Sequence, residues 1–126
     1  MKIKIIALGK VNESYLKVGV DEFLKRISPY CPIEVIEIKP VEVKDDNLIK
    51  RSLDMEAEKI LSFIKPSSFV ITMEIEGKML SSEDFAEQIN AIANSGTNEL
   101  VFVIGSSHGI SEKVSYRADY KLSLSK

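Results

Sequence analysis

The residues most capable of chemistry lie in one short stretch, "LVFVIGSSHGI". Five apolar residues lead into Gly105, which is followed by Ser107, the chain's single histidine, His108, and Gly109. The Gly-x-Ser-x-Gly spacing matches the nucleophile elbow of serine hydrolases, in which a sharp strand-to-helix turn exposes the serine. The stretch therefore raises three hypotheses: a serine nucleophile, a cofactor-binding loop, or only a tight turn.

The serine-nucleophile hypothesis lacks a base. In hydrolases with this elbow the histidine lies far downstream of the serine, whereas His108 is adjacent to Ser107 and no histidine follows it. The spacing of Gly105 and Gly109 also matches neither a dinucleotide fingerprint nor a phosphate-binding P-loop. A ligand-binding loop and a turn in which the glycines only permit the backbone conformation therefore both stay open.

Length and composition describe an ordinary soluble globular chain. With 126 residues, 44% hydrophobic and 29% charged, it is expected to form one domain over residues 1–126. Seventeen Lys and Arg against nineteen Asp and Glu give a net charge of −2. This balance excludes a protein that binds free nucleic acid through bulk charge, although it is compatible with a local basic patch.

Cysteine content and the amino terminus bound the compartment. Cys31 is the only cysteine, so no intramolecular disulfide can form, and no Cys and His cluster has zinc spacing. Its position before Pro32 favours a small buried hydrophobe over a reactive thiol. The start "MKIKIIALGK" is too short and too charged for a signal peptide, and no apolar run has the length of a membrane span. These features predict a cytoplasmic protein with no bound metal and no membrane partner.

Hydrophobic periodicity predicts strands that alternate with helices. The predicted strands are residues 2–8, 32–38, 69–75, 99–104 and 120–125, and the predicted helices are residues 11–27, 49–64, 82–95 and 112–118. Ser111 and Gly96 are expected as helix caps, and Glu76-Gly77 as the turn that ends a strand. This alternation predicts an α/β fold, a mainly parallel sheet with helices on both faces.

The parallel sheet also predicts where a ligand would bind. In such sheets ligands lie beyond the carboxyl ends of the strands. The most apolar runs, residues 69–75 and 100–104, are expected as central strands. The glycine-serine loop and the segment 73–77 should then lie side by side at the ligand-binding edge.

Five segments, in their order and spacing, resemble one family over the whole chain. They are "MKIKIIALGK", "EFLKRISPY", "IEVIEI", "FVITMEIEGKMLSSEDFA" and "LVFVIGSSHGIS", and the family is the RlmH family of SPOUT-class methyltransferases. The resemblance implies S-adenosylmethionine-dependent methylation of N3 of a pseudouridine in 23S rRNA of the assembled ribosome. It also implies a trefoil-knot fold, which is rare because chains otherwise almost never thread their own loops.

The resemblance further implies which residues bind the cofactor among three knot loops. Met73, where the family more often has leucine, would contact the adenine from the first loop. Gly105, in the second loop, would let the backbone approach the cofactor. Leu124, Ser125 and Lys126 would hydrogen-bond the adenine through their backbone groups. The resemblance implies no metal, and no residue of this chain stands out as the catalytic base.

The chain departs from the family pattern in two places. Ser106 stands where the family commonly has a second glycine, a modest change. Family members also continue beyond the position of Lys126, with a segment that completes the third loop and the knot and supplies much of a homodimer contact. A chain ending at Lys126 is therefore expected to be a shortened SPOUT domain with an incomplete knot. Its last strand should leave apolar surface uncovered, and its dimer should be weakened. Cofactor binding should be weak, and methylation should be undetectable.

Two other hypotheses come from different functional classes. One is a non-catalytic α/β module that keeps weak cofactor or nucleoside binding. The other is an unrelated small α/β enzyme that uses the serine-rich loop. Binding of S-adenosylmethionine separates the last hypothesis from the methyltransferase and the non-catalytic module.

Overall fold

The structure is a computed structural model of the chain, and it describes residues 1–9, 25, 32–41, 45–79, 82–105 and 109–123. Several features of the sequence analysis therefore lie outside the described residues. One is the predicted helix over residues 11–27, of which only Lys25 is described. The others are Cys31, Ser106, Ser107, His108, Leu124, Ser125 and Lys126.

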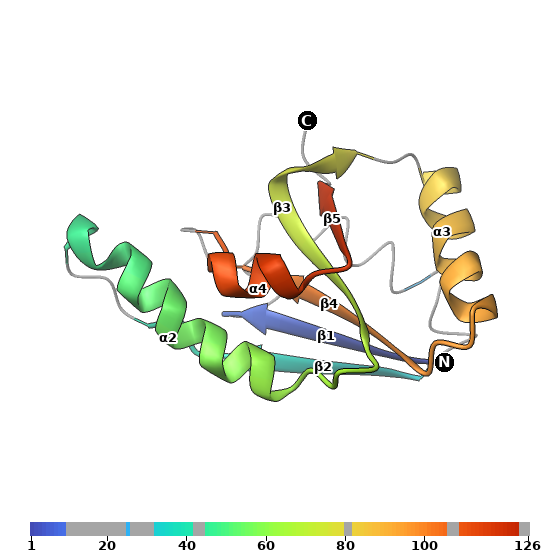
Figure 1. Cartoon of the computed structure of the whole chain (residues 1–126), viewed down its shortest axis with the longest axis horizontal. Coiled ribbons are helices and arrows are strands. Elements are labelled where there is room, and N and C mark those ends of the chain that lie inside the picture. Colours follow the sequence, from blue (N-terminus) through green and yellow to red (C-terminus); the bar gives the residue numbers. More distant parts are fainter. Residues whose placement is uncertain (10–24, 26–31, 42–44, 80–81, 106–108, 124–126) are drawn as a thin grey trace.

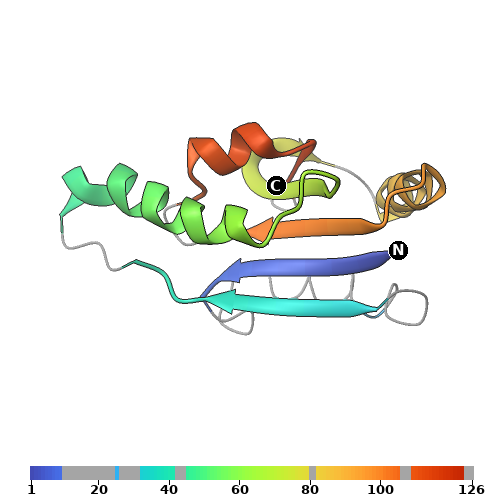
Figure 2. The ribbon, with the colours of Figure 1, turned by 60° about the horizontal axis from the view of Figure 1, so that its bottom comes forward.

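Five parallel strands form a single sheet in the order β2-β1-β4-β3-β5. The strands are β1 (Lys2–Leu8), β2 (Ile33–Ile38), β3 (Phe69–Met79), β4 (Glu99–Ile104) and β5 (Tyr120–Ser123). Figures 1 and 2 both show β1, β2 and β4 side by side with their arrowheads toward the same end. The predicted parallel α/β fold is confirmed. The two most apolar runs, β3 and β4, are interior strands as expected, because side chains on both of their faces must be covered.

One face of the sheet is covered by α2 (Ile49–Ser62), which follows a short 3-10 turn, η2 (Asp46–Leu48), and by α4 (Glu112–Arg117). Figure 1 shows these two helices together, apart from α3. The helical periodicity that predicted a helix over residues 49–64 is confirmed, since Ala57 and Ile60 are buried on this face. The buried residues of this cluster are Ile6, Leu8, Ile38, Ala57, Ile60, Val70, Val101, Val103 and Val114.

The opposite face carries a second apolar cluster, to which α3 (Ser82–Asn94) contributes. Phe85 of this helix lies against Phe102 of β4 with ring centroids 6.1 Å apart. The buried residues of the cluster are Ile3, Ile5, Ala7, Ile71, Ile89, Ile92, Leu100, Phe102, Ile104 and Leu122. Alternate residues of β1, β3 and β4 thus enter alternate clusters, as strands covered on both faces require. Among the residues that the structure describes, no helix is long and apolar enough to cross a membrane.

Two of the predicted caps are confirmed. The Ser111 hydroxyl accepts a hydrogen bond from the Lys113 backbone N–H at 3.2 Å and begins α4. Gly96 has φ +89°, the left-handed conformation that favours glycine just beyond the end of a helix. The helix predicted to reach residue 64 ends at Ser62, and Pro66 follows in the loop to β3.

The strand β5 is better covered than its sequence predicts. Leu122 is 1% exposed and belongs to the same cluster as Ile71 of the neighbouring strand. The expectation of uncovered apolar surface is therefore wrong at Leu122, because β5 turns this side chain inward against residues already present in the chain.

Truncation of Leu122 tests this packing. We expect Leu122→Ala to lower the free energy of unfolding by about 2–5 kcal/mol, because it removes apolar contacts and leaves a cavity. The exposed neighbour supplies the control: Lys121→Ala should change stability by no more than about 0.5 kcal/mol. Urea unfolding of both variants measures the difference, and equal stability of the two would contradict the packing of β5 described above.

Candidate functional site

The ends of three neighbouring strands meet at the carboxyl edge of the sheet. Met73 of β3 is in register with Ile104 of β4 on one side and with Leu122 of β5 on the other. Gly105 follows Ile104 directly, so it lies next to the point where β3 leaves its regular pairing. The predicted position of Gly105 beside residue 73 is confirmed, whereas Ser106, Ser107 and His108 lie outside the described residues. The chain that leads to Leu124 starts from the same edge.

The segment 74–77 forms a bulge in β3. Leu122 is in register with both Met73 and Lys78. The four residues between these two positions therefore have no register partner in β5. Pairing then resumes with Met79 and Ser123, and Figure 1 shows the strand bending sharply here. The prediction that Glu76-Gly77 ends the strand is wrong: the turn is a bulge inside β3. A bulge frees backbone groups from the ladder and redirects the strand.

Gly105 is required by its own loop. A Cβ at this position would lie 2.5 Å from the Gly109 carbonyl oxygen and 2.6 Å from Cγ1 of Ile110. Gly109 itself has φ +95°, a conformation that glycine adopts without strain. The chain thus folds back onto the end of β4. The sequence predicted a glycine here so that the backbone could approach a cofactor. The structure adds a second reason for glycine, because the backbone of Gly109 already occupies the place of a side chain.

Met73 has a clear structural role. Its side chain is partly buried and packs against the cluster that contains Ile104 and Leu122. This is the core packing that a lone methionine in a strand most often serves. Its position at the carboxyl edge also suits the adenine contact that the resemblance implies, and that contact stays a prediction.

A second feature lies where α2 and α4 begin. A shallow hollow of about 380 Å³ is lined by Asn47, Lys50, Arg51, Asp54, Met55, Glu58 and Lys113. The Ser111 hydroxyl donates a hydrogen bond of 2.9 Å to Asp54 and so ties the first turn of α4 to α2. In Figure 1 both helices begin at the side toward which β1 and β4 point.

No pattern in the sequence predicted this hollow. Lys50, Arg51 and Asp54 are spaced to share one side of a helix, but Lys113 joins them only through tertiary packing. Within the described residues, no group of three or more His, Cys, Asp or Glu side chains gathers in a way that could hold a metal ion.

Comparison with known proteins decides the family. A family model described as "Predicted SPOUT methyltransferase" matches residues 1–126. The chain belongs to the SPOUT methyltransferase family. It is also 46% identical over 132 aligned residues to a protein of Clostridioides difficile (strain 630) named "Ribosomal RNA large subunit methyltransferase H". That alignment covers 100% of this chain and 81% of the relative. The five-stranded parallel α/β sheet agrees with the SPOUT assignment.

A pair of glycine substitutions tests whether the loop that begins at Gly105 contributes to cofactor binding. In Gly105→Ala the new methyl group meets the backbone of Gly109, so the loop must move. We expect the affinity for S-adenosylmethionine, measured by calorimetry, to fall about tenfold or more.

The control is Gly96→Ala, at the opposite edge of the sheet. It has open space around the added Cβ but an unfavourable positive φ, so it should lower stability by about 1 kcal/mol and leave cofactor affinity unchanged. Equal affinity of the two variants for the cofactor would remove the Gly105 loop from the site.

Proposed function

We propose that this SPOUT methyltransferase transfers a methyl group from S-adenosylmethionine to N3 of a pseudouridine in 23S rRNA of the assembled ribosome. The observation that carries the proposal is the 46% identity, over the entire chain, to a protein named for ribosomal RNA large subunit methylation. The arrangement of the carboxyl edge supports it, because Met73, Gly105 and the end of β5 lie next to one another there.

The cofactor would bind at this edge. Met73 and the bulge at residues 74–77 supply the first loop, Gly105 the second, and the backbone of Leu124, Ser125 and Lys126 the third. The bulge supports this role because residues 74–77 are released from the β3–β5 register, and backbone groups outside a ladder are available to a ligand. The sulfonium of the cofactor is an activated methyl donor, so the protein's main task is to position the nucleophile.

The rRNA needs local cations, since the chain as a whole has a net charge of −2. We propose that Lys50, Arg51 and Lys113, three exposed cations around the hollow, contact phosphates of the rRNA. Two carboxylates also line the hollow. Asp54 accepts a hydrogen bond from the Ser111 hydroxyl, and Glu58 lies one helical turn further along α2. The family resemblance adds a homodimer to the proposal, and the cysteine content and amino-terminal sequence add a cytoplasmic location.

The function is tested with the full-length protein and ribosomes from a strain that lacks the modification. We expect calorimetry to show binding of S-adenosylmethionine and mass spectrometry of the rRNA to show one added methyl group on a pseudouridine. Ser107→Ala should keep the rate within a few-fold of the wild type, and a serine-directed phosphonate should not label the protein. Cofactor binding without methyl transfer would favour a non-catalytic module, and labelling of Ser107 would revive the hydrolase hypothesis.

The RNA surface has its own test. The triple variant Lys50→Ala, Arg51→Ala, Lys113→Ala should bind ribosomes more weakly. The logarithmic salt dependence of its binding should become shallower by about 0.7–0.9 for each phosphate that the variant no longer neutralises. The control variant Lys59→Ala, Lys65→Ala removes two exposed cations of α2 and the loop after it, neither of which lines the hollow. An identical salt slope for both variants would contradict the proposed surface.

A further inference from the structure

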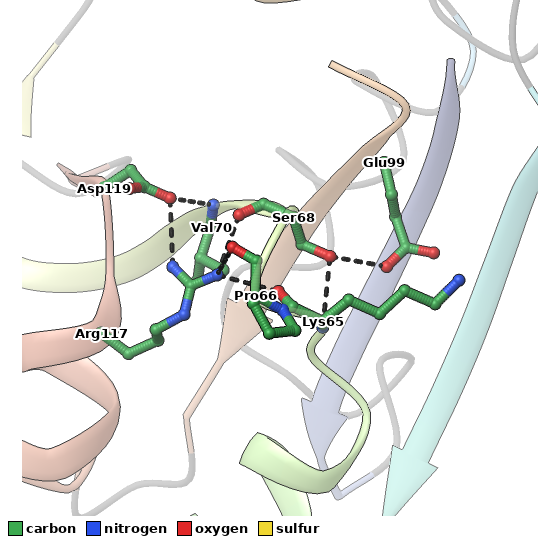
Figure 3. A network of polar contacts seen from close by, with 7 residues as sticks. All are labelled: Lys65, Pro66, Ser68, Val70, Glu99, Arg117 and Asp119. Atoms are coloured by element: carbon green, nitrogen blue, oxygen red, sulfur yellow. Dashed lines mark hydrogen bonds and ion pairs between the residues drawn. The ribbon is translucent and has the colours of Figure 1, made fainter.

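Arg117, the last residue of α4, holds a loop on the edge of the sheet opposite the candidate site (Figure 3). Its Nη2 donates hydrogen bonds to the backbone carbonyls of Lys65 at 3.0 Å, Pro66 at 3.4 Å and Ser68 at 2.9 Å. Its Nη1 pairs with Oδ2 of Asp119 at 3.3 Å. One guanidinium thus joins the end of α4, the loop before β3 and the residue that precedes β5.

Asp119 continues this contact into the sheet. Its Oδ2 accepts a hydrogen bond from the Val70 backbone N–H at 2.8 Å, and its own backbone N–H donates to the Val70 carbonyl at 2.8 Å. The next residues, Ile71 and Tyr120, form the first registered pair of β3 and β5. Asp119 therefore occupies both hydrogen-bonding groups of Val70 at the position where this pairing starts.

The register of β5 depends on such an anchor. The strand has four residues and lies at the edge of the sheet, so few ladder bonds hold it. A slip of one residue would turn Lys121, which is exposed, toward the core in place of buried Leu122. A slip of two residues would keep the faces but move the end of the strand by about 6.6 Å along the sheet.

We propose that Arg117 and Asp119 are positioning residues for the methyltransferase. They fix the register of β5 on β3 and thereby set where β5 ends relative to the bulge at residues 74–77 and to Gly105. This inference rests on the proposed function, because it takes that edge as the cofactor site. Neither residue touches the cofactor, since both lie at the amino end of a strand whose carboxyl end leads into the site.

The neighbouring part of the polar network offers a matched control (Figure 3). The Ser68 hydroxyl donates to Oε1 of Glu99 at 2.9 Å and accepts from the Lys65 backbone N–H at 3.3 Å. Ser68→Ala removes these two bonds but keeps the Ser68 carbonyl that Arg117 binds. It therefore weakens the same loop without altering the contacts of Asp119 with β3.

The experiment compares Arg117→Ala, Arg117→Lys, Asp119→Asn and Ser68→Ala with the wild type, each at a temperature where it is folded. Calorimetry measures the affinity for S-adenosylmethionine, and hydrogen exchange measures protection of the β5 amides that donate to β3. We expect Arg117→Ala to lose this protection and to bind the cofactor about tenfold or more weakly. Arg117→Lys and Asp119→Asn should be intermediate, because each keeps part of the contact, whereas Ser68→Ala should lose stability but keep wild-type affinity.

Several outcomes would overturn the inference. One is an Arg117→Ala protein with wild-type affinity and wild-type protection of β5. Another is a Ser68→Ala protein that binds the cofactor as weakly as Arg117→Ala, because loop stability would then explain the effect. If Arg117→Ala does not fold, Arg117→Lys and Asp119→Asn decide by the same two measurements. A wild type that does not bind S-adenosylmethionine overturns the proposed function, and hydrogen exchange then still decides whether Arg117 fixes the register of β5.

Discussion

The pairing of β5 with β3 is the constraint on which the candidate site depends. The pairing begins where Asp119 forms hydrogen bonds with both the backbone N–H and the carbonyl of Val70. It is interrupted at the carboxyl edge by the bulge after Met73. Between these points a short edge strand contributes the buried side chain of Leu122 to the core. Any shift in this pairing would change the distance between the bulge, the Gly105 loop and the chain that follows β5.

The two edges of the sheet have different chemistry. At the amino edge, Lys4 and Glu99 form an ion pair of 3.5 Å with side chains 10% and 9% exposed, and the Lys4 ammonium also donates to the Phe63 carbonyl at 3.1 Å. Such a pair is tolerated in a core only when further hydrogen bonds compensate for lost hydration. The carboxyl edge has Gly105 after β4 and the bulge inside β3, and the exposed cations Lys50, Arg51 and Lys113 lie near the starts of α2 and α4.

Local pattern was sufficient to predict most of the elements. The ranges of β1 and β4 agree with the predicted ones, and Ser111 and Gly96 cap their helices as expected, because periodicity and caps depend on neighbours within a few residues. The bulge in β3 was missed. Whether β3 resumes pairing at Lys78 depends on β5, more than forty residues later in the chain, and no local pattern contains that information.

The sequence by itself determined the α/β class, the parallel sheet, the placement of Gly105 beside residue 73 and, through its motifs, the methyltransferase family. Only the tertiary structure decided why Gly105 must lack a side chain, since the atoms that exclude a Cβ belong to the returning loop. It alone also decided that Lys4 faces inward and that Arg117 binds three carbonyls of a distant loop. Long polar side chains follow no periodicity, because their partners are chosen by contacts between remote segments and not by neighbours in the chain.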